Sequence, residues 1–194
     1  RTMKKRNQIL DYFKEVTIVV IGVLIAVSIG NYKEKLDNEE YLEKTLKAIQ
    51  NEIVTSQSDI DTVLYRHIGL LEKLEADFIE NQMTLGEFVS NSGGFQVAFI
   101  KNISLRFFIS NKAELLEYEM IAQLLEIEEI TKILSAKVDR LASFTYDHIN
   151  ENNKEVMVKF AYLLSDVIDS ERSLLESYSE FLEQNQKKLE TENE

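Results

Sequence analysis

The chain has 194 residues and a formal net charge of −12. It contains no cysteine, which excludes disulfides and thiolate metal sites, and no proline, which leaves helices free to run long. So acidic a chain repels nucleic acid, and we do not expect nucleic-acid binding. The length fits one domain of ordinary size.

The N-terminal region joins a basic tail to the most apolar stretch of the chain. Four basic residues lie in the tail, 1–8, and a run of fourteen uncharged residues occupies 16–29. Fourteen residues are fewer than the ~20 that span a bilayer. Apolar and aromatic residues from position 9, together with Tyr32, extend the run. We therefore predict a single transmembrane helix at 9–32 in the lipid bilayer.

Two other interpretations of this run are open. A cleavable signal peptide also has a basic start, an apolar core and small residues such as Ser28 and Gly30 before the cleavage site. Asp11 and Glu15 do not fit that profile. A buried core helix is the usual interpretation of an apolar run of this length, but 16–29 is apolar on all its faces. We favour the membrane anchor.

One face of the predicted span carries small residues at regular spacing. Gly22, Ala26 and Gly30 are four residues apart, and such residues let two membrane helices pack closely. Glu15 lies seven residues before Gly22 on nearly the same face, where a carboxyl group must be protonated, hydrated or paired. We predict that these four residues contact a partner helix, in a second copy or in another membrane protein.

Residues 34–80 predict one long helix with a heptad seam, as in a coiled coil. The seam begins at Leu42, Leu46, Ile49 and Ile53, and Ser56 takes the next position. The polar stretch 55–59 indicates a kink or a break. An apolar face then resumes at Ile60, Leu64, Ile68, Leu71, Leu74 and Phe78. We interpret His67, beside this face, as a partly buried surface histidine rather than a ligand.

Residues 81–94 interrupt the helical pattern. Thr84 is placed to cap a short turn that carries Leu85, Phe88 and Val89. The stretch 90–94, which ends in two glycines, is the clearest loop of the chain. For the apolar stretch 95–109 we favour a helix or a loop packed in the core over one or two short strands.

The C-terminal part predicts further helices. Asn111 with Glu114 fits a capping box at the start of a short helix. A longer helix from about 127 to 149 carries Ile127, Ile130, Ile133 or Leu134, Val138, Leu141, Phe144 and His148. After a turn at 150–153, the last helix has its seam at Val156, Phe160, Leu163, Val167, Leu174, Tyr178 and Phe181, with Glu171 at one position. Long helices joined by short loops predict an all-α fold, an antiparallel helical bundle over 33–194.

The sequence holds no recognisable catalytic or metal-binding motif. The two histidines, His67 and His148, are far apart, and neither belongs to a Glu-x-x-His motif. Gly-x-Ser-x-Gly and Gly-x-Gly-x-x-Gly are also missing from the sequence. We expect neither enzyme activity nor a cofactor.

Residues 15–46 resemble a family of small single-pass membrane proteins of Bacteroidota, a domain of unknown function. The family shows Gly-Glu, an apolar run with Val-Ile-Gly-Ile-Leu-Ile-Ala-Leu, and then Asn-Asn-Trp-Asn-Glu. Here the match falls on Glu15, on Ile-Gly-Val-Leu-Ile-Ala at 21–26 and on Gly-Asn-Tyr-Lys-Glu at 30–34. Lys14 stands where the family has glycine. The resemblance implies an inner-membrane anchor with a periplasmic helical domain.

These observations predict a membrane-anchored helical interaction or scaffold protein, a homo-oligomer or an accessory subunit of an inner-membrane complex. Because basic residues that flank a span stay in the cytoplasm, we expect a cytoplasmic tail at 1–8. Residues 33–194, where acidic residues far outnumber basic ones, are expected in the periplasm. The alternative is a periplasmic ligand-sensing module that signals through a partner.

Overall fold

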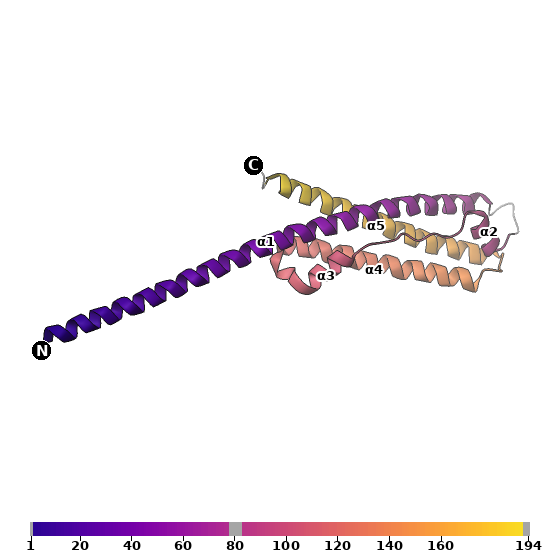
Figure 1. Cartoon of the computed structure of the whole chain (residues 1–194). Coiled ribbons are helices and arrows are strands. Elements are labelled where there is room, and N and C mark those ends of the chain that lie inside the picture. The colour runs from indigo at the N-terminus through magenta and orange to yellow at the C-terminus, as the bar shows by residue number, and fades with distance from the viewer. Residues whose placement is uncertain (1, 78–82, 192–194) are drawn as a thin grey trace. The chain divides into compact units, whose positions relative to one another are not determined.

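The computed structural model describes residues 2–77 and 83–191, with side chains for 12–74, 83–113 and 115–184 (Figure 1). Within these ranges the chain forms α-helices and one short 3-10 turn and has no β-strand, which confirms the all-α class. The chain divides into two compact units, Arg1–Leu46 and Lys47–Glu194.

The first helix, α1, runs without interruption from Thr2 to Asp77. The break considered at 55–59 therefore does not occur. Polar side chains in this stretch bond within the helix: the Thr55 hydroxyl donates to the carbonyl oxygen of Asn51 at 2.8 Å. A hydroxyl bonded to the carbonyl oxygen four residues back can bend a helix but does not end it, and no proline interrupts α1.

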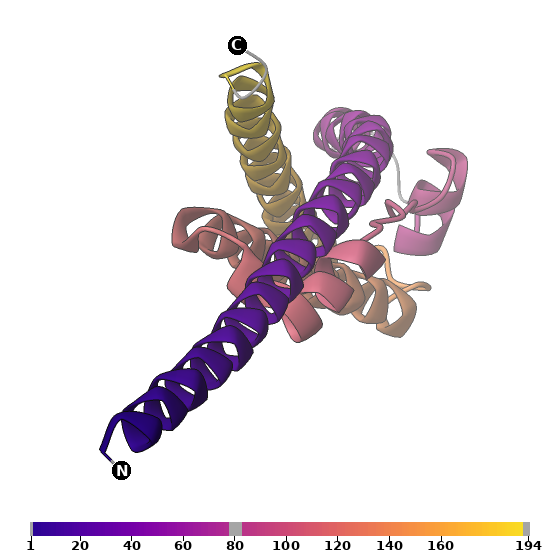
Figure 2. The ribbon, with the colours of Figure 1, turned by 60° about the vertical axis from the view of Figure 1, so that its left-hand side comes forward.

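Helices α4 (Tyr118–Asp147) and α5 (Lys154–Thr191) pack along each other in the second unit (Figures 1 and 2). Near the start of α4, the Gln123 amide donates to Gln184 near the end of α5 at 2.6 Å. Further along α4, the Lys137 ammonium donates to the carbonyl oxygen of Asp166 at 3.1 Å. These two helices therefore run in opposite directions.

The turn between α4 and α5 confirms the predicted one. Helix α5 starts after Asn153, whose side-chain oxygen accepts a hydrogen bond from the Val156 amide at 2.9 Å, as an N-cap residue does. The predicted seam of α5 is also confirmed, since all of its apolar members and Glu171 are buried. Helix α4 begins at Tyr118, earlier than expected, and at the position left open Leu134 is buried while Ile133 is exposed.

The part of α1 in the second unit has a strict heptad seam facing α5. Its buried residues alternate in steps of four and three: Ile49, Ile53, Ser56, Ile60, Val63, His67, Leu70 and Leu74. Gln57, beside this seam, donates a hydrogen bond to Ser179 of α5 at 3.2 Å. The same spacing continues from before Ser56 to after it, so one face of α1 contributes to the core throughout.

After Ile60 the predicted face of α1 is confirmed at Leu74, which is buried, and wrong at the three residues before it. Leu64, Ile68 and Leu71 are only half-buried, and the seam continues instead through His67. The prediction had placed the apolar residues Leu64 and Ile68 on the buried face, whereas the polar residue His67 occupies the seam position. Phe78, the last residue of the predicted face, lies outside the described residues.

Helix α2 (Leu85–Asn91) confirms the predicted cap. The Thr84 hydroxyl accepts a hydrogen bond from the Glu87 amide, and the Glu87 carboxylate accepts one from the Thr84 amide, which is a capping box. Leu85 and Phe88 are buried, and the Phe88 ring meets that of Phe160 on α5 edge to face, with the centroids 6.5 Å apart. The cap thus fixes a short helix whose apolar side covers α5.

An extended segment, the strap (94–102), joins α2 to α3 (Ile103–Lys112) (Figures 1 and 2). It follows Gly93 and begins at Gly94, and the φ angles of these two residues, 95° and 82°, favour glycine. The stretch 95–109, for which we favoured a helix or a loop over strands, is therefore a loop up to Asn102 and a helix from Ile103 onward. The capping box expected at Asn111 is wrong, because Asn111 lies in the last turn of α3 and donates to the Phe107 carbonyl oxygen.

Candidate functional site

In the first unit, the apolar stretch of α1 is uncovered. From Val16 to Ile29 the large apolar side chains are between 42% and 69% exposed, and none of the most apolar window is buried. By length and composition α1 is the one helix among the described residues that is able to cross a membrane. A surface this apolar and continuous needs a cover other than water.

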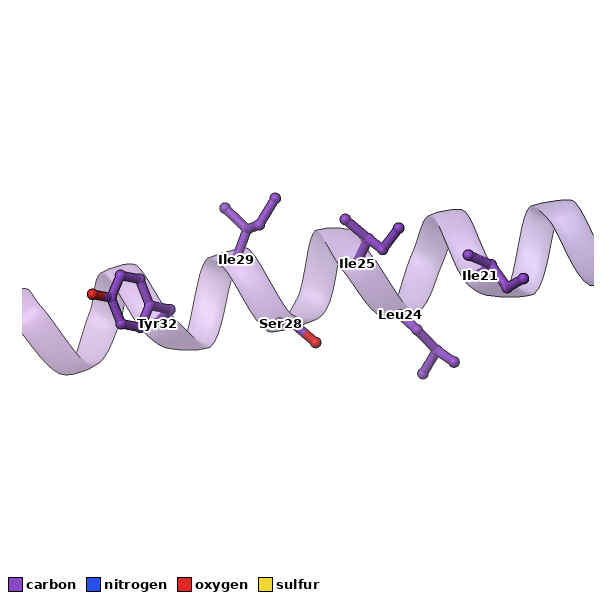
Figure 3. A pocket seen from close by; sticks show the side chains of 6 residues that line it. All are labelled: Ile21, Leu24, Ile25, Ser28, Ile29 and Tyr32. Atoms are coloured by element: carbon purple, nitrogen blue, oxygen red, sulfur yellow. The ribbon is translucent and has the colours of Figure 1, made fainter.

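One face of this stretch forms a shallow apolar groove (Figure 3). Six side chains line it: Ile21, Leu24, Ile25, Ser28, Ile29 and Tyr32. Figure 3 shows that Ile25 and Ile29 project from one edge of the helix and that Leu24 projects from the opposite edge. The groove is open and has no polar lining except Ser28 and the Tyr32 hydroxyl, so it offers packing contacts rather than chemistry.

The four predicted contact residues lie on a neighbouring face of the same helix. Glu15, Gly22, Ala26 and Gly30 are all exposed, and none of them lines the groove. A Cβ atom added to Gly22 or Gly30 would meet nothing within 4 Å. The small-residue face is thus open for close approach of another helix, and its role as a contact stays a prediction.

The second unit contains a different feature, a set of polar side chains in its core. The buried polar residues are Ser56, His67, Thr131, Ser170 and Glu171. Every described and buried side-chain nitrogen or oxygen has a hydrogen-bond partner. Because an unpaired buried polar group costs ~1–3 kcal/mol, this complete pairing restricts the helices to one arrangement.

His67 and Glu171 form the most enclosed pair in this set. The imidazole Nδ1 lies 3.0 Å from one carboxylate oxygen of Glu171 and 3.1 Å from the other, and each side chain is 2% exposed. The imidazole Nε2 lies 2.9 Å from the carbonyl oxygen of Gln96 in the strap. The Phe95 ring stacks on the imidazole, with the centroids 4.8 Å apart and the planes 7° from parallel. The interpretation of His67 as a partly buried surface residue is wrong.

Side chains of α1 hold the strap and the start of α3 by their backbone atoms. The Glu52 carboxylate accepts from the Ser104 amide at 3.0 Å, and the Ser56 hydroxyl accepts from the Lys101 amide at 2.8 Å. His67 completes this set through its contact with the carbonyl oxygen of Gln96. The strap has neither helix nor strand, so these side chains satisfy backbone groups that no regular structure satisfies.

Tyr178 of α5 closes the core beside Ser56. Its side chain is 1% exposed, and its hydroxyl is hydrogen-bonded to Ser56 and to Thr131 of α4. Burial raises the pKa of the Tyr178 phenol above its ordinary value of 10.0, because the ionised form would lose its hydration. One hydroxyl therefore connects all three long helices.

The side chains of this polar core are buried and hydrogen-bonded to one another or to the backbone. No cluster of three or more histidine, aspartate or glutamate residues that would hold a metal ion occurs in the described part of the chain. His148 and Glu151 form a second pair, 2.7 Å apart, in the half-exposed turn after α4. Both pairs join an imidazole to a carboxylate, but the first pair is buried and the second is half-exposed.

The chain matches no protein-family model, no curated protein and no solved structure. The resemblance of residues 15–46 to the Bacteroidota family therefore stays an expectation. What the protein does must be inferred from its own geometry.

The His67–Glu171 pair was missed in the sequence, although both signals are present in it. Glu171 stands at a seam position of its helix, and His67 stands at a seam position once the heptad from Ile49 is continued without a break. Polar residues at seam positions of two helices are candidates for a buried pair. Which of them meet depends on how α1 and α5 are aligned, which the sequence does not show.

Proposed function

We propose that this protein is a membrane-anchored helical interaction protein, either a homo-oligomer or an accessory subunit of an inner-membrane complex. The observation that carries the proposal is the uncovered apolar stretch at 16–29, in a chain whose second unit buries its own apolar seams. The seams of the second unit are covered within the chain, whereas the stretch 16–29 is not. We therefore expect another molecule to cover this stretch. Lipid and a partner helix are the covers that fit a surface of this length.

The proposed topology places the basic tail in the cytoplasm and the second unit in the periplasm. Its support is the basic cluster before the span and the acidic excess after it. The proposed fold of the periplasmic part is an antiparallel bundle in which α5 lies between α1 and α4. Its support is the pairing of Gln57 with Ser179 and of Gln123 with Gln184.

The small-residue face is the proposed contact within the membrane. Between helices in lipid there is no hydrophobic drive, so close backbone packing and polar contacts must hold them together. Gly22 and Gly30 have open space where a Cβ would be, which allows such an approach. Glu15 would find a hydrogen-bond partner on the second helix, since a lone carboxyl at the edge of the hydrocarbon is costly.

The test is the size of the complex in mild detergent. Gly22→Leu adds a bulky apolar side chain to the contact face, so insertion should survive and association should weaken. Ser28→Leu is the matched control, because it adds similar bulk about 120° around the helix from Gly22, away from the small-residue face. Light scattering coupled to chromatography, with mass spectrometry of copurified proteins, separates a homo-oligomer from a mixed complex.

Glu15 is tested separately. Glu15→Gln keeps a polar group and removes the ionisable one, while Glu15→Leu removes both. We expect Glu15→Leu to weaken the complex more than Glu15→Gln does. A wild-type protein that is monomeric and copurifies with nothing would contradict the proposed function. A complex that Gly22→Leu leaves unchanged would instead move the contact to the second unit.

A further inference from the structure

We propose that the outward side of the strap and of α3 binds a second copy of this chain, where it packs against the outward side of α4. The inference deepens the proposed function and rests on its homo-oligomer form. It is carried by exposed apolar side chains in the strap and α3, by the basic residues among them, and by a complementary set of residues on α4.

The outward side of the strap and α3 presents large apolar side chains to solvent. We call it the basic surface, and it consists of Val97, Phe99, Lys101, Ile103, Arg106 and Phe107. Its four apolar side chains are between 59% and 76% exposed. In the strap the exposed residues alternate with the half-buried Ala98 and Ile100, and in α3 the buried residues are Leu105 and Phe108. Exposed apolar residues that follow one another on one side of a short segment mark an interaction site.

The backbone beneath this surface is held in place by α1. The Glu52 carboxylate accepts a hydrogen bond from the Ser104 amide, and the Ser56 hydroxyl accepts one from the Lys101 amide. His67 contacts the carbonyl oxygen of Gln96. A surface that is already ordered loses little conformational entropy when it binds, which favours association.

The charge of this part of the chain is opposite to that of the whole. Residues 88–113 contain three basic residues and no acidic one, although the net charge of the chain is −12. Lys101 and Arg106 are both exposed. The Nε atom of Arg106 lies 4.0 Å from a carboxylate oxygen of Glu128, and the Arg106 side chain is still 66% exposed. The partner should therefore present acidic groups next to apolar ones.

Helix α4 has such a surface. We call it the acidic surface, and it consists of Tyr118, Leu125, Glu126, Glu129 and Ile133, all of which are exposed. With about 100° of rotation for each residue, these five lie within an arc of about 100° on the helix. Residues 118–133 contain four glutamates and one lysine. The acidic surface thus combines apolar side chains with negative charge, as the basic surface combines them with positive charge.

A second copy of the chain brings the two surfaces together. The contact of Arg106 with Glu128 shows that α3 lies beside the first half of α4, so the two surfaces are on neighbouring elements. Both point away from the core, so within one copy they do not cover each other. In a two-fold dimer each basic surface meets the acidic surface of the other copy, which gives two identical contacts. Two basic surfaces packed on each other would instead place like charges together.

Cysteine cross-linking of the full chain in mild detergent tests the contact directly, because the chain has no cysteine of its own. A copy with Phe107→Cys and one tag is produced together with a copy that has Leu125→Cys and another tag. A short bismaleimide should join the two into a dimer that carries both tags. Tyr65→Cys in place of Leu125→Cys is the matched control at an exposed residue of α1, and it should give several-fold less of this dimer.

The strength of self-association is the second measurement. Phe99→Ser combined with Phe107→Ser removes two aromatic side chains from the basic surface and should raise the dissociation constant about tenfold or more. Tyr146→Ser combined with Tyr162→Ser removes two equally exposed aromatic side chains outside both surfaces and should leave it unchanged. Sedimentation velocity measures both variants, and circular dichroism checks that they are folded.

The outcomes separate this inference from the proposed function. A chain that self-associates without forming the dimer with both tags, and whose association the phenylalanine variant does not weaken, overturns the inference and leaves the proposed function intact. The same holds for a chain that is itself monomeric and copurifies with another protein, because it is then an accessory subunit. A chain that is monomeric and copurifies with nothing overturns both.

Discussion

The backbone of Gly86 lies directly against Ile149. The Gly86 amide donates to the Ile149 carbonyl oxygen at 2.8 Å, and a Cβ on Gly86 would stand 2.6 Å from the Cγ1 atom of Ile149. The next amide, of Leu85, donates to the carbonyl oxygen of Glu151 at 2.8 Å. The start of α2 is thus bonded to the turn between α4 and α5, at a distance that only glycine permits.

Gly86→Ala should therefore destabilise the protein. The added methyl group would overlap both a side chain and a carbonyl oxygen, and overpacking of this kind costs ~1–3 kcal/mol. Urea unfolding of the full chain in detergent, followed by circular dichroism, measures the change in the free energy of unfolding.

Gly69→Ala is the matched control for that variant. Gly69 lies within α1, and a Cβ added there would meet nothing within 4 Å, so alanine only improves the helix. We expect a gain of ~0.5–1 kcal/mol. Equal effects of the two substitutions would contradict the contact with Ile149.

The capping box of α2 makes stability sensitive to acid. The hydrogen bond from the Thr84 amide holds the pKa of the Glu87 carboxyl below its ordinary value of 4.5. A lowered folded-state pKa contributes stability that is complete above pH 4.5 and lost as the pH falls through the folded value. The stability difference between the wild type and Glu87→Gln should shrink on acidification below pH 4.5. A constant difference in unfolding experiments across this range would contradict the assignment.

Tyr178 predicts the behaviour at the alkaline end. Because burial raises its pKa, the folded chain keeps the phenol proton while the unfolded chain loses it above pH 10.0. The stabilising contribution is complete below that pH and is lost as the pH rises. Tyr178→Phe should cost ~0.5–1.5 kcal/mol near neutral pH and flatten the alkaline loss of stability. Tyr65→Phe, at a residue 81% exposed, should do neither.

The topology is open to direct labelling, because the chain has no cysteine of its own. In intact spheroplasts, Thr2→Cys should resist an impermeant thiol reagent, and Asn153→Cys should react with it. The physical reason is the retention of the basic tail in the cytoplasm. Reactive Thr2→Cys with protected Asn153→Cys would reverse the proposed orientation.

Local patterns predicted the helices well where apolar residues alone mark the buried face. The seam of α5 from Val156 to Phe181 and the cap at Thr84 depend on residues close in sequence, and both are confirmed. Asn111 shows the limit of such signals. The sequence predicted it at the start of a helix, whereas it lies in the last turn of α3 and its side chain donates to the Phe107 carbonyl oxygen.

The polar core was not predictable in the same way. His67 was assigned to the surface because Leu64 and Ile68 beside it are apolar, and only continuation of the strict heptad places it inside. Its partner Glu171 is 104 positions away, and the strap residue Gln96 contributes a carbonyl oxygen that any residue type has. Contacts made by backbone atoms leave no mark in the sequence of the segment that makes them.

The attachment of the strap also constrains the number of residues between the attachment points on α1. Glu52, Ser56 and His67 fall within an arc of about 60° when each residue turns the helix by about 100°. One residue inserted between Ser56 and His67 would rotate these two attachment points apart by about 100°, and seven residues would bring them almost back into line. Changes in the length of this part of α1 should therefore be tolerated in whole heptads.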